Sequence, residues 1–279
     1  MRLPLYYDGG AGRNFAMAFL PEAADALRWS ARGLGVVVAP PFAEEMNKSR
    51  RTLSLLGAAL ARDGVPVLLP DLHGTGDSAG EFADARWDIW SADLLAAVEL
   101  MVSRGAARVA VLGLRLGALL ALDTAAADTP RVSHLLLWQP VISGRQYVTQ
   151  FLRLGVAAAL AGGGTDTVTA IRGRLASDGI VEIGGYALSR ELASAIEERE
   201  LAAAPRPAQP VRWFEVSADP RRPLAGPAQA LVDLWRAQGA DVDCTPVAGD
   251  AFWATQEIAE APRLIEATAT CLLALGGPT

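Results

Sequence analysis

The stretch that decides the fold is residues 108–122, RVAVLGLRLGALLAL. Residues 108–112 form a short run that is apolar apart from Arg108 and ends at Gly113. Such a run predicts a strand buried on both faces of a sheet. Gly117–Ala127 has the composition of a helix, so the strand passes through Gly113-Leu114-Arg115-Leu116-Gly117 directly into that helix. Such a connection aims its central side chain, Arg115, at a pocket above the sheet, while the glycines leave room for neighbouring backbone.

Strand and helix patterns alternate on both sides of this stretch. Further strands are expected at residues 35–39, 65–69, 133–138, 211–216 and 242–247, after an N-terminal hairpin at 3–7 and 14–20. Helices are expected at residues 46–63, 87–104, 117–127, 227–238 and 255–275. Strands that alternate with helices indicate βαβ units. The expected fold class is therefore α/β, a mostly parallel central sheet flanked by helices.

Residues 142–210 break the alternation. They read as about seventy residues of helical pattern with no convincing strand, and they end in the Pro-rich APRPAQP at 204–210. We therefore expect a core formed by residues 1–141 and 211–279, with residues 142–210 inserted as a helical lid. Open α/β sheets bind ligands at the carboxyl ends of their strands, which is the edge this lid would cover.

Composition and charge narrow the function classes. The 279 residues are 51% hydrophobic and 20% charged, which supports a large folded core and argues against a disordered chain. The net charge of −6 argues against a nucleic-acid binder. The two cysteines are too few for a disulfide framework and suit a reducing compartment. With no signal-peptide pattern and no apolar stretch long enough to span a membrane, we expect a cytoplasmic protein.

Three further motifs carry a resemblance to a known family. They are PPFAEEMNKSRR at 40–51, PDLHGTGDSAG at 70–80 and GLRLGALLA at 113–121. With these motifs the chain resembles the α/β-hydrolase superfamily, in which G-x-nucleophile-x-G forms the nucleophile elbow. More narrowly, it is similar to the exosortase A system-associated hydrolase 2 group. These are bacterial proteins whose genes accompany protein-sorting and exopolysaccharide systems.

The resemblance implies positions for the catalytic groups. The loop at residues 40–45 would be the oxyanion loop, with backbone N–H donors from Phe42 or Ala43 and from Leu116. Asp219, just after the strand at 211–216, would be the acid of a catalytic triad. The loop at residues 248–253, AGDAFW, would carry the catalytic histidine.

Two of these three triad positions lack the required residue. Arg115 stands at the nucleophile position, and a guanidinium that is always protonated is not a nucleophile. The loop at 248–253 contains no histidine, and the chain has only two, His73 and His134. His134 opens an expected buried strand and is interpreted as structural. Without a histidine partner, Asp219 is interpreted as a salt-bridge or turn residue.

His73 has two interpretations. It follows the strand at 65–69, where it either braces the loop through a hydrogen bond or acts as a base near the pocket mouth. A base role requires an unusual nucleophile, and the candidates Ser49, Thr75 and Ser78 are more simply helix caps or turn residues.

Arg115 also has two interpretations. A guanidinium at a helix N-terminus, beside oxyanion-hole amides, suits a bound carboxylate or phosphate. It also suits an internal ion pair with Glu44 or Glu45 on the facing loop, because an unpaired charge under a lid is costly. An incoming anion that displaces the glutamate would reconcile the two. In either case the tight turn predicts a positive φ at Arg115.

Two functions remain open. In the first, the chain is a degenerate hydrolase that binds a small acyl or anionic ligand, or a protein of the exosortase and exopolysaccharide system. In the second, it is an active esterase- or thioesterase-like hydrolase, or an acyltransferase, with a non-standard site. Neither requires a cofactor, and no cluster of histidine and acidic residues has metal-ligand spacing. The oligomeric state is not predicted.

Overall fold

The computed structural model describes residues 1–25, 28–30, 32–127 and 130–275. Ten strands are assigned in this part of the chain. They are β1 (Arg2–Asp8), β2 (Arg13–Phe19), β3 (Leu34–Ala39), β4 (Val67–Pro70), β5 (Arg108–Leu114), β6 (Val132–Trp138), β7 (Ile180–Ile183), β8 (Tyr186–Ser189), β9 (Val211–Ser217) and β10 (Val242–Ala248).

Eight of these strands form one sheet in the order β1-β2-β4-β3-β5-β6-β9-β10. The last six strands in this order, β4, β3, β5, β6, β9 and β10, run parallel. β1 and β2 form an antiparallel hairpin that pairs with β4. β5 lies in the middle of the sheet, between β3 and β6. Because β5 is covered on both faces, all its residues except Arg108 are buried.

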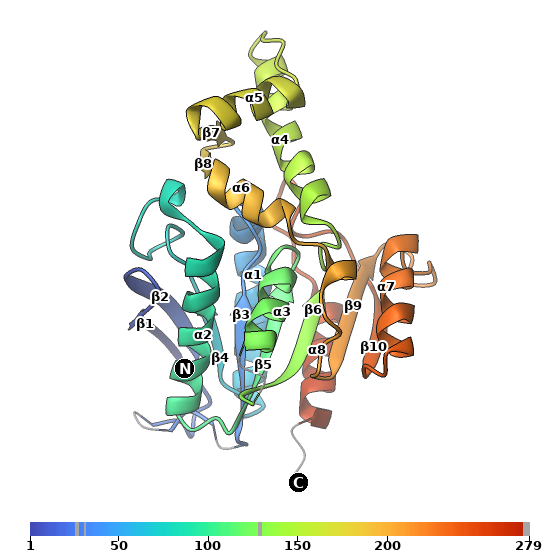
Figure 1. Ribbon diagram of the computed structural model, residues 1–279. Helices are drawn as coiled ribbons and strands as arrows, with labels where there is room; N and C mark the ends of the chain where they lie inside the picture. The colour runs from blue at the N-terminus through green and yellow to red at the C-terminus, as the bar shows by residue number, and fades with distance from the viewer. Residues whose placement is uncertain (26–27, 31, 128–129, 276–279) are drawn as a thin grey trace.

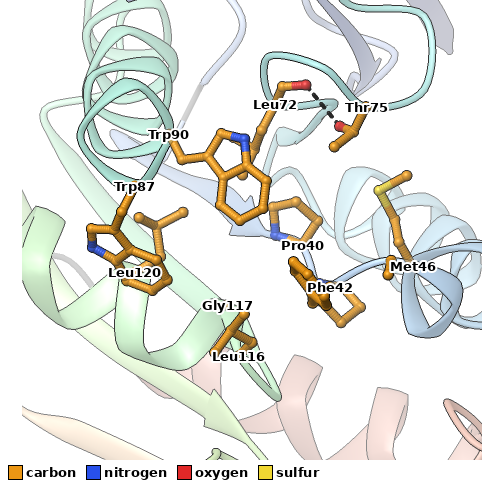
Figure 2. A pocket seen from close by; sticks show the side chains of 12 residues that line it. Pro40, Phe42, Met46, Leu72, Thr75, Trp87, Trp90, Leu116, Gly117 and Leu120 are labelled. Carbon is orange, nitrogen blue, oxygen red and sulfur yellow. Dashed lines mark hydrogen bonds between the residues drawn. The ribbon is translucent and has the colours of Figure 1, made fainter. Parts of the chain in front are cut away.

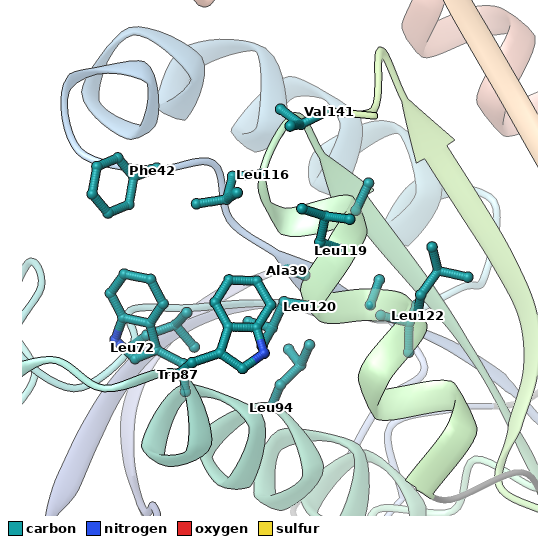
Figure 3. Packing of buried hydrophobic residues seen from close by; sticks show 14 of the residues in the cluster. Ala39, Phe42, Leu72, Trp87, Leu94, Leu116, Leu119, Leu120, Leu122 and Val141 are labelled. Carbon is teal, nitrogen blue, oxygen red and sulfur yellow. The ribbon is translucent and has the colours of Figure 1, made fainter. Parts of the chain in front are cut away.

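Helices cover both faces of the sheet (Figure 1). They are α1 (Glu44–Arg62), α2 (Trp87–Ser103), α3 (Gly117–Ala127), α4 (Gly144–Ala161), α5 (Val168–Asp178), α6 (Arg190–Glu197), α7 (Gly226–Ala237) and α8 (Pro262–Leu275), with 3-10 turns η1 (Phe82–Asp84) and η2 (Leu201–Ala203). α2, α3 and α7 bury their apolar residues in one core and α1 and α8 theirs in the other. Trp87 and Leu94 of α2 lie against Leu119 and Leu120 of α3 in the first core (Figure 3).

The segment between β6 and β9 projects beyond the carboxyl ends of the parallel strands (Figure 1). α4 enters it, α5 and the β7–β8 hairpin lie at its far end, and α6 returns toward the core. Leu152 of α4 and Ile196 of α6 are fully buried. The N-terminal half of α4 reaches the loop that follows β3, because Phe151 packs on Phe42 with 5.0 Å between ring centroids.

The expected α/β class is confirmed, and most elements lie within two residues of the expected ranges. Two predictions were wrong. Residues 142–210 do contain strands, the antiparallel pair β7 and β8, joined by the turn at Gly184-Gly185. The last helix begins at Pro262 and not at residue 255, because proline suits the first helical position, where no N–H is needed. No helix in the described ranges is long and apolar enough to cross a membrane.

Candidate functional site

Arg115 occupies the turn between β5 and α3. Its φ is 56°, in the left-handed region, so the predicted positive φ is confirmed. Three backbone hydrogen bonds hold the turn: Arg115 N–H donates to Trp138 O at 3.0 Å, and Arg115 O accepts from Ala118 N–H at 3.1 Å and from Val141 N–H at 3.2 Å. A non-glycine residue in this conformation costs about 1–3 kcal/mol. The packing of the surrounding strands therefore fixes the direction of the Arg115 side chain.

The flanking glycines are required by close backbone approaches. A Cβ on Gly117 would lie 2.2 Å from Ala39 O and 2.5 Å from Pro40 O, both at the end of β3. A Cβ on Gly113 would lie 2.4 Å from Cα of Ala118. The spacing of the two glycines around Arg115 thus reflects the tight packing of β5, the turn and α3.

Backbone strain concentrates around Arg115. Within the described part of the chain, the non-glycine residues with positive φ are Ala43 at 53°, Arg115 at 56° and Gln139 at 45°. They follow β3, β5 and β6, three neighbouring strands whose carboxyl ends meet at one edge of the sheet. Residues in such sparsely populated conformations cluster at functional sites, so this edge is the candidate site.

The Arg115 guanidinium makes an ion pair with a glutamate of the facing loop. Arg115 Nε lies 3.3 Å from Glu45 Oε1, so the predicted pairing with Glu44 or Glu45 is confirmed, with Glu45 as the partner. Arg115 Nη1 also donates to Gln139 O at 3.4 Å. The side chains of Arg115 and Glu45 are only 18% and 20% exposed, so the pair is largely shielded from water.

Two aromatic rings complete the surroundings of the guanidinium. Arg115 Cζ lies 5.3 Å from the ring centroid of Trp253 and 5.9 Å from that of Tyr147. Trp253 belongs to the loop at 248–253, where the resemblance places a catalytic histidine. An indole that carries no basic nitrogen therefore faces the elbow residue from that loop. The cation–π contacts stabilise the charge of Arg115 in this partly dry position.

Glu45 links Arg115 to the inserted segment. The Tyr147 hydroxyl, at the start of α4, donates a hydrogen bond to Glu45 Oε2 at 2.9 Å. Burial raises the pKa of Glu45 above its ordinary value, and the Arg115 charge and the Tyr147 hydrogen bond offset this only in part. Burial likewise raises the pKa of Tyr147, and the Glu45 charge adds to the rise. Tyr147 therefore acts as a proton donor toward the carboxylate at neutral pH.

The raised pKa of Glu45 predicts how stability depends on pH. The folded protein holds this proton above pH 4.5, the ordinary pKa at which the unfolded chain releases it. The contribution of Glu45 to stability is therefore fully present below pH 4.5 and is lost as the pH rises through the folded pKa. We expect the unfolding free energy of the native protein minus that of Glu45→Gln, measured by urea titration between pH 4 and 8, to fall with rising pH. Glu44→Gln, on the same turn, is the matched control. A difference that rises with pH would contradict the assignment.

The other predicted residues lie apart from the guanidinium. Glu44 is exposed and bonds to Asn47 and Tyr186. Asp219 is 54% exposed and pairs with Arg221 at 3.0 Å, which also holds the pKa of Asp219 below its usual range.

His73 is buried, and its backbone is held on both sides. The backbone N–H of His73 donates to Asp93 Oδ2 at 2.7 Å, and its carbonyl accepts from Trp90 Nε1 at 2.9 Å. Its Nδ1 has no hydrogen-bond partner among the described residues.

The hydroxyls of the alternative nucleophiles, Ser49, Thr75 and Ser78, either bond to nearby backbone or are buried inside a helix. The Thr75 hydroxyl donates to Leu72 O and the Ser78 hydroxyl to Asp71 O, both at 2.7 Å. Ser49 is fully buried within α1, and its hydroxyl has no partner in the described part of the chain. Neither Ser49 nor Ser78 lines a cavity at Arg115, and no hydrogen bond joins any of the three to His73.

The backbone donors expected for an oxyanion hole remain free. No hydrogen bond between described residues is donated by the N–H groups of Phe42, Ala43 or Leu116. These residues line an apolar cavity of only about 20 Å³, little more than the space of one water molecule (Figure 2). Trp87, Trp90 and Leu120 fill the space on its other side. An acyl group does not fit beside these donors without rearrangement.

Two larger clefts, each of about 220 Å³, lie on either side of Tyr147. One runs between α1 and α4 and is lined by Phe42, Glu44, Glu45, Lys48, Tyr147, Gln150, Phe151, Leu154, Trp253 and Ala254. The other reaches Arg115 from the side of α7 and is lined by residues that include Pro140, Ser143, Gln146 and Pro227. The Arg115–Glu45–Tyr147 group thus separates two openings. In the described ranges no group of three His, Cys, Asp or Glu residues is placed to hold a metal.

Sequence reasoning missed three residues of this site. Tyr147 carries no local signal, since it belongs to the inserted segment and meets Glu45 only through the tertiary fold. Gln139 fixes β6 to β9, because its side chain bonds to Glu215 and to the N–H of Val216. Trp253 is visible in the AGDAFW sequence at 248–253, but nothing local indicates that it faces Arg115. Trp253 faces Arg115 because the tertiary fold brings the 248–253 loop next to the elbow.

The family follows from a comparison of the sequence with protein-family models. The model described as Hydrolase_4, serine aminopeptidase S33, matches residues 36–176, just over half of the chain. The chain belongs to the serine aminopeptidase S33 family. The match spans the elbow, the PDLHGTGDSAG motif at residues 70–80 and the first part of the inserted segment. At the elbow this S33-family chain has Arg115 where the family's name implies a serine.

Solved structures show the same fold over nearly the whole chain. Est1E from Butyrivibrio proteoclasticus with bound ferulic acid has a TM-score of 0.70 at 16% identity and covers 97% of this chain and 98% of its own. A lidless α/β serine hydrolase from Xanthomonas campestris has a TM-score of 0.59 at 16% identity, with 100% and 96% covered. Mouse α/β-hydrolase domain-containing protein 10 has 0.56 at 16% identity, with 98% of each chain covered. A search of curated proteins finds no match.

Proposed function

We propose that this S33-family chain is a degenerate hydrolase that binds a small acyl or anionic ligand at its elbow and does not turn it over. The observation that carries the proposal is the Arg115 guanidinium, which lies in the strained turn of the nucleophile and is paired with Glu45 at 3.3 Å. A side chain that is always protonated provides no electron pair for attack on a carbonyl. It does provide several N–H donors for an anion.

The surroundings of Arg115 support the loss of catalysis. Trp253 and not histidine faces the elbow, and Asp219 is engaged with Arg221. The cavity beside the free N–H groups of Phe42, Ala43 and Leu116 is too small for an acyl group. Removal of a triad nucleophile or base lowers the rate by about 10⁴-fold or more, and this chain lacks both.

The resemblance of the 40–51, 70–80 and 113–121 motifs supports a place in the exosortase A system-associated group. We therefore include a protein of the exosortase and exopolysaccharide system as an alternative occupant of the site. The proposal places the chain in the cytoplasm. Its two free cysteines, Cys244 and Cys271, support a reducing compartment.

One observation favours a second candidate, an active hydrolase or acyltransferase with a non-standard site. Glu45 is a largely buried carboxylate whose pKa is raised by burial, and such groups serve as general bases. In that case Glu45 would activate water or an acceptor hydroxyl toward an acyl group brought in through one of the 220 Å³ clefts. This candidate predicts turnover that Glu45→Gln abolishes.

A screen with p-nitrophenyl esters of acetate, butanoate and octanoate separates the two candidates. We expect no turnover above background for the native protein or for Arg115→Ala. Arg115→Ser should also remain far below the roughly 10 per second of ordinary enzymes, because a serine with no base is a poor nucleophile. Turnover by the native protein that Arg115→Ala or Glu45→Gln abolishes would establish the enzyme candidate. Efficient turnover by Arg115→Ser alone would reveal an unrecognised base, with His73 the first to test.

A further inference from the structure

The Glu45 carboxylate occupies the same donors that a ligand anion would use. Its Oε1 lies 3.3 Å from Arg115 Nε, and its Oε2 accepts from the Tyr147 hydroxyl at 2.9 Å. The two donors come from the elbow and from α4, so both oxygens of one planar group are recognised from two elements. We infer that the ligand's head group is a carboxylate, which displaces Glu45 from Arg115 and Tyr147. This inference rests on the proposed function.

The pairing of Glu45 with Arg115 is incomplete, which makes it replaceable. The guanidinium offers five N–H groups, of which Glu45 takes one and Gln139 O another at the long distance of 3.4 Å. A carboxylate that is not tethered to α1 is free to approach the edge of the guanidinium with two parallel hydrogen bonds, the stronger arrangement. A ligand carboxylate therefore gains contacts that Glu45, anchored in the first turn of α1, does not make.

Lys48 provides a place for the displaced Glu45 side chain. It follows Glu45 by three residues on α1, and glutamate and lysine at this spacing are neighbours on a helix surface. Lys48 lines the cleft beside Glu45, and within the described ranges it forms no ion pair. A glutamate that turns away from Arg115 therefore stays charge-paired at the cleft wall.

The cleft between α1 and α4 sets the size of the ligand's tail. The rings of Phe42, Phe151 and Trp253 and the half-exposed Leu154 give it an apolar wall. Its volume of about 220 Å³ is below the roughly 300–1,000 Å³ of sites for drug-sized ligands. Arg115 does not line this cleft, but Glu45 stands between the two, so a head group that takes the place of Glu45 at Arg115 puts its tail in the cleft. The ligand class is therefore a carboxylic acid with a short or medium hydrocarbon chain that runs along α4.

The test is calorimetric titration of sodium octanoate, octyl phosphate, inorganic phosphate and 1-octanol at pH 7. We expect Glu45→Gln to bind octanoate at least about tenfold more tightly than the native protein, because the competing charge is removed. Glu99→Gln, which removes a half-exposed carboxylate on α2 outside both clefts, should bind as the native protein does. Arg115→Met should bind no octanoate. 1-Octanol and inorganic phosphate should bind much more weakly, and Glu45→Ala repeats the comparison if Glu45→Gln does not fold.

Several results would overturn the inference. In one such result, both Glu45 variants bind octanoate no more tightly than the native protein does, and binding still depends on Arg115. This result would show that Glu45 is not displaced, and it would leave the proposed function intact. Tighter binding of octyl phosphate than of octanoate would exclude a carboxylate head group. Lys48→Met should weaken octanoate binding by the native protein and not by Glu45→Gln; equal weakening in both would overturn the role of Lys48. If no anion binds to any form, the proposed function fails as well.

Discussion

Replacement of Gly117 by alanine should destabilise the fold by at least about 3 kcal/mol, at or above the upper end of what overpacking usually costs. The added Cβ would lie 2.2 Å from Ala39 O and 2.5 Å from Pro40 O, and both contacts are with backbone, which does not rotate away. Relief of the clash requires β3 or the start of α3 to shift, in the centre of the sheet. Urea unfolding followed by circular dichroism measures the loss.

Gly173→Ala is the matched control for this experiment. Gly173 lies inside α5, and a Cβ there would meet nothing within 4 Å. Because glycine in a helix costs about 0.5–1 kcal/mol relative to alanine, the same substitution should stabilise the protein slightly at this position. A Gly117→Ala variant as stable as the native protein would mean that the elbow is not packed as tightly as the structure shows.

Phe42→Ala should cost about 3–5 kcal/mol, the range for loss of a buried aromatic side chain. Phe42 is 5% exposed, and its ring centroid lies 5.0 Å from that of Phe151 and 6.0 Å from that of Tyr147. It also contacts Phe82 and Trp90, so it joins the inserted segment to the core. We expect both a lower unfolding free energy and faster proteolysis within residues 144–203.

Leu154→Ala tests whether the effect is specific. Leu154 belongs to the same helix α4 but is 55% exposed, so its truncation should change stability by no more than about 0.5 kcal/mol. It should also leave the proteolysis of the inserted segment unchanged. Equal effects of Phe42→Ala and Leu154→Ala would contradict the idea that the aromatic contacts of Phe42 hold the segment on the core.

Patterns within short stretches of sequence predicted the secondary structure and the turn at Arg115. The buried strands, the helices and the turn at Arg115 follow from residue periodicity and from glycine positions, and apart from the start of the last helix the structure has them within two residues. The β7–β8 hairpin also has a local signal: apolar Val181 and Ile183 alternate with Glu182, and Gly184-Gly185 follows as the turn. This alternation is only four residues long and lies between two helical patterns, so the pattern of the whole segment favours helix.

The sequence also predicted the charge partner of Arg115 to within two residues, Glu44 and Glu45. A guanidinium in a mostly dry position needs an acid, and the loop at residues 40–45 offers Glu44 and Glu45. The choice between the two depends on the first turn of α1, which turns Glu45 inward and leaves Glu44 exposed. Neighbours on a helix point about 100° apart, so the helix start determines which one reaches the elbow.

By itself, the sequence determined that this chain folds as an α/β sheet with an arginine where a nucleophile would stand. Only the tertiary structure brought Tyr147 and Trp253 to that arginine, from segments 32 residues and 138 residues farther along the chain. It also decided that the cavity at the free N–H donors is small while the clefts beside Tyr147 are larger. Local patterns record which face of an element is buried. Contacts between distant segments, and the volumes left between them, depend on how whole elements pack.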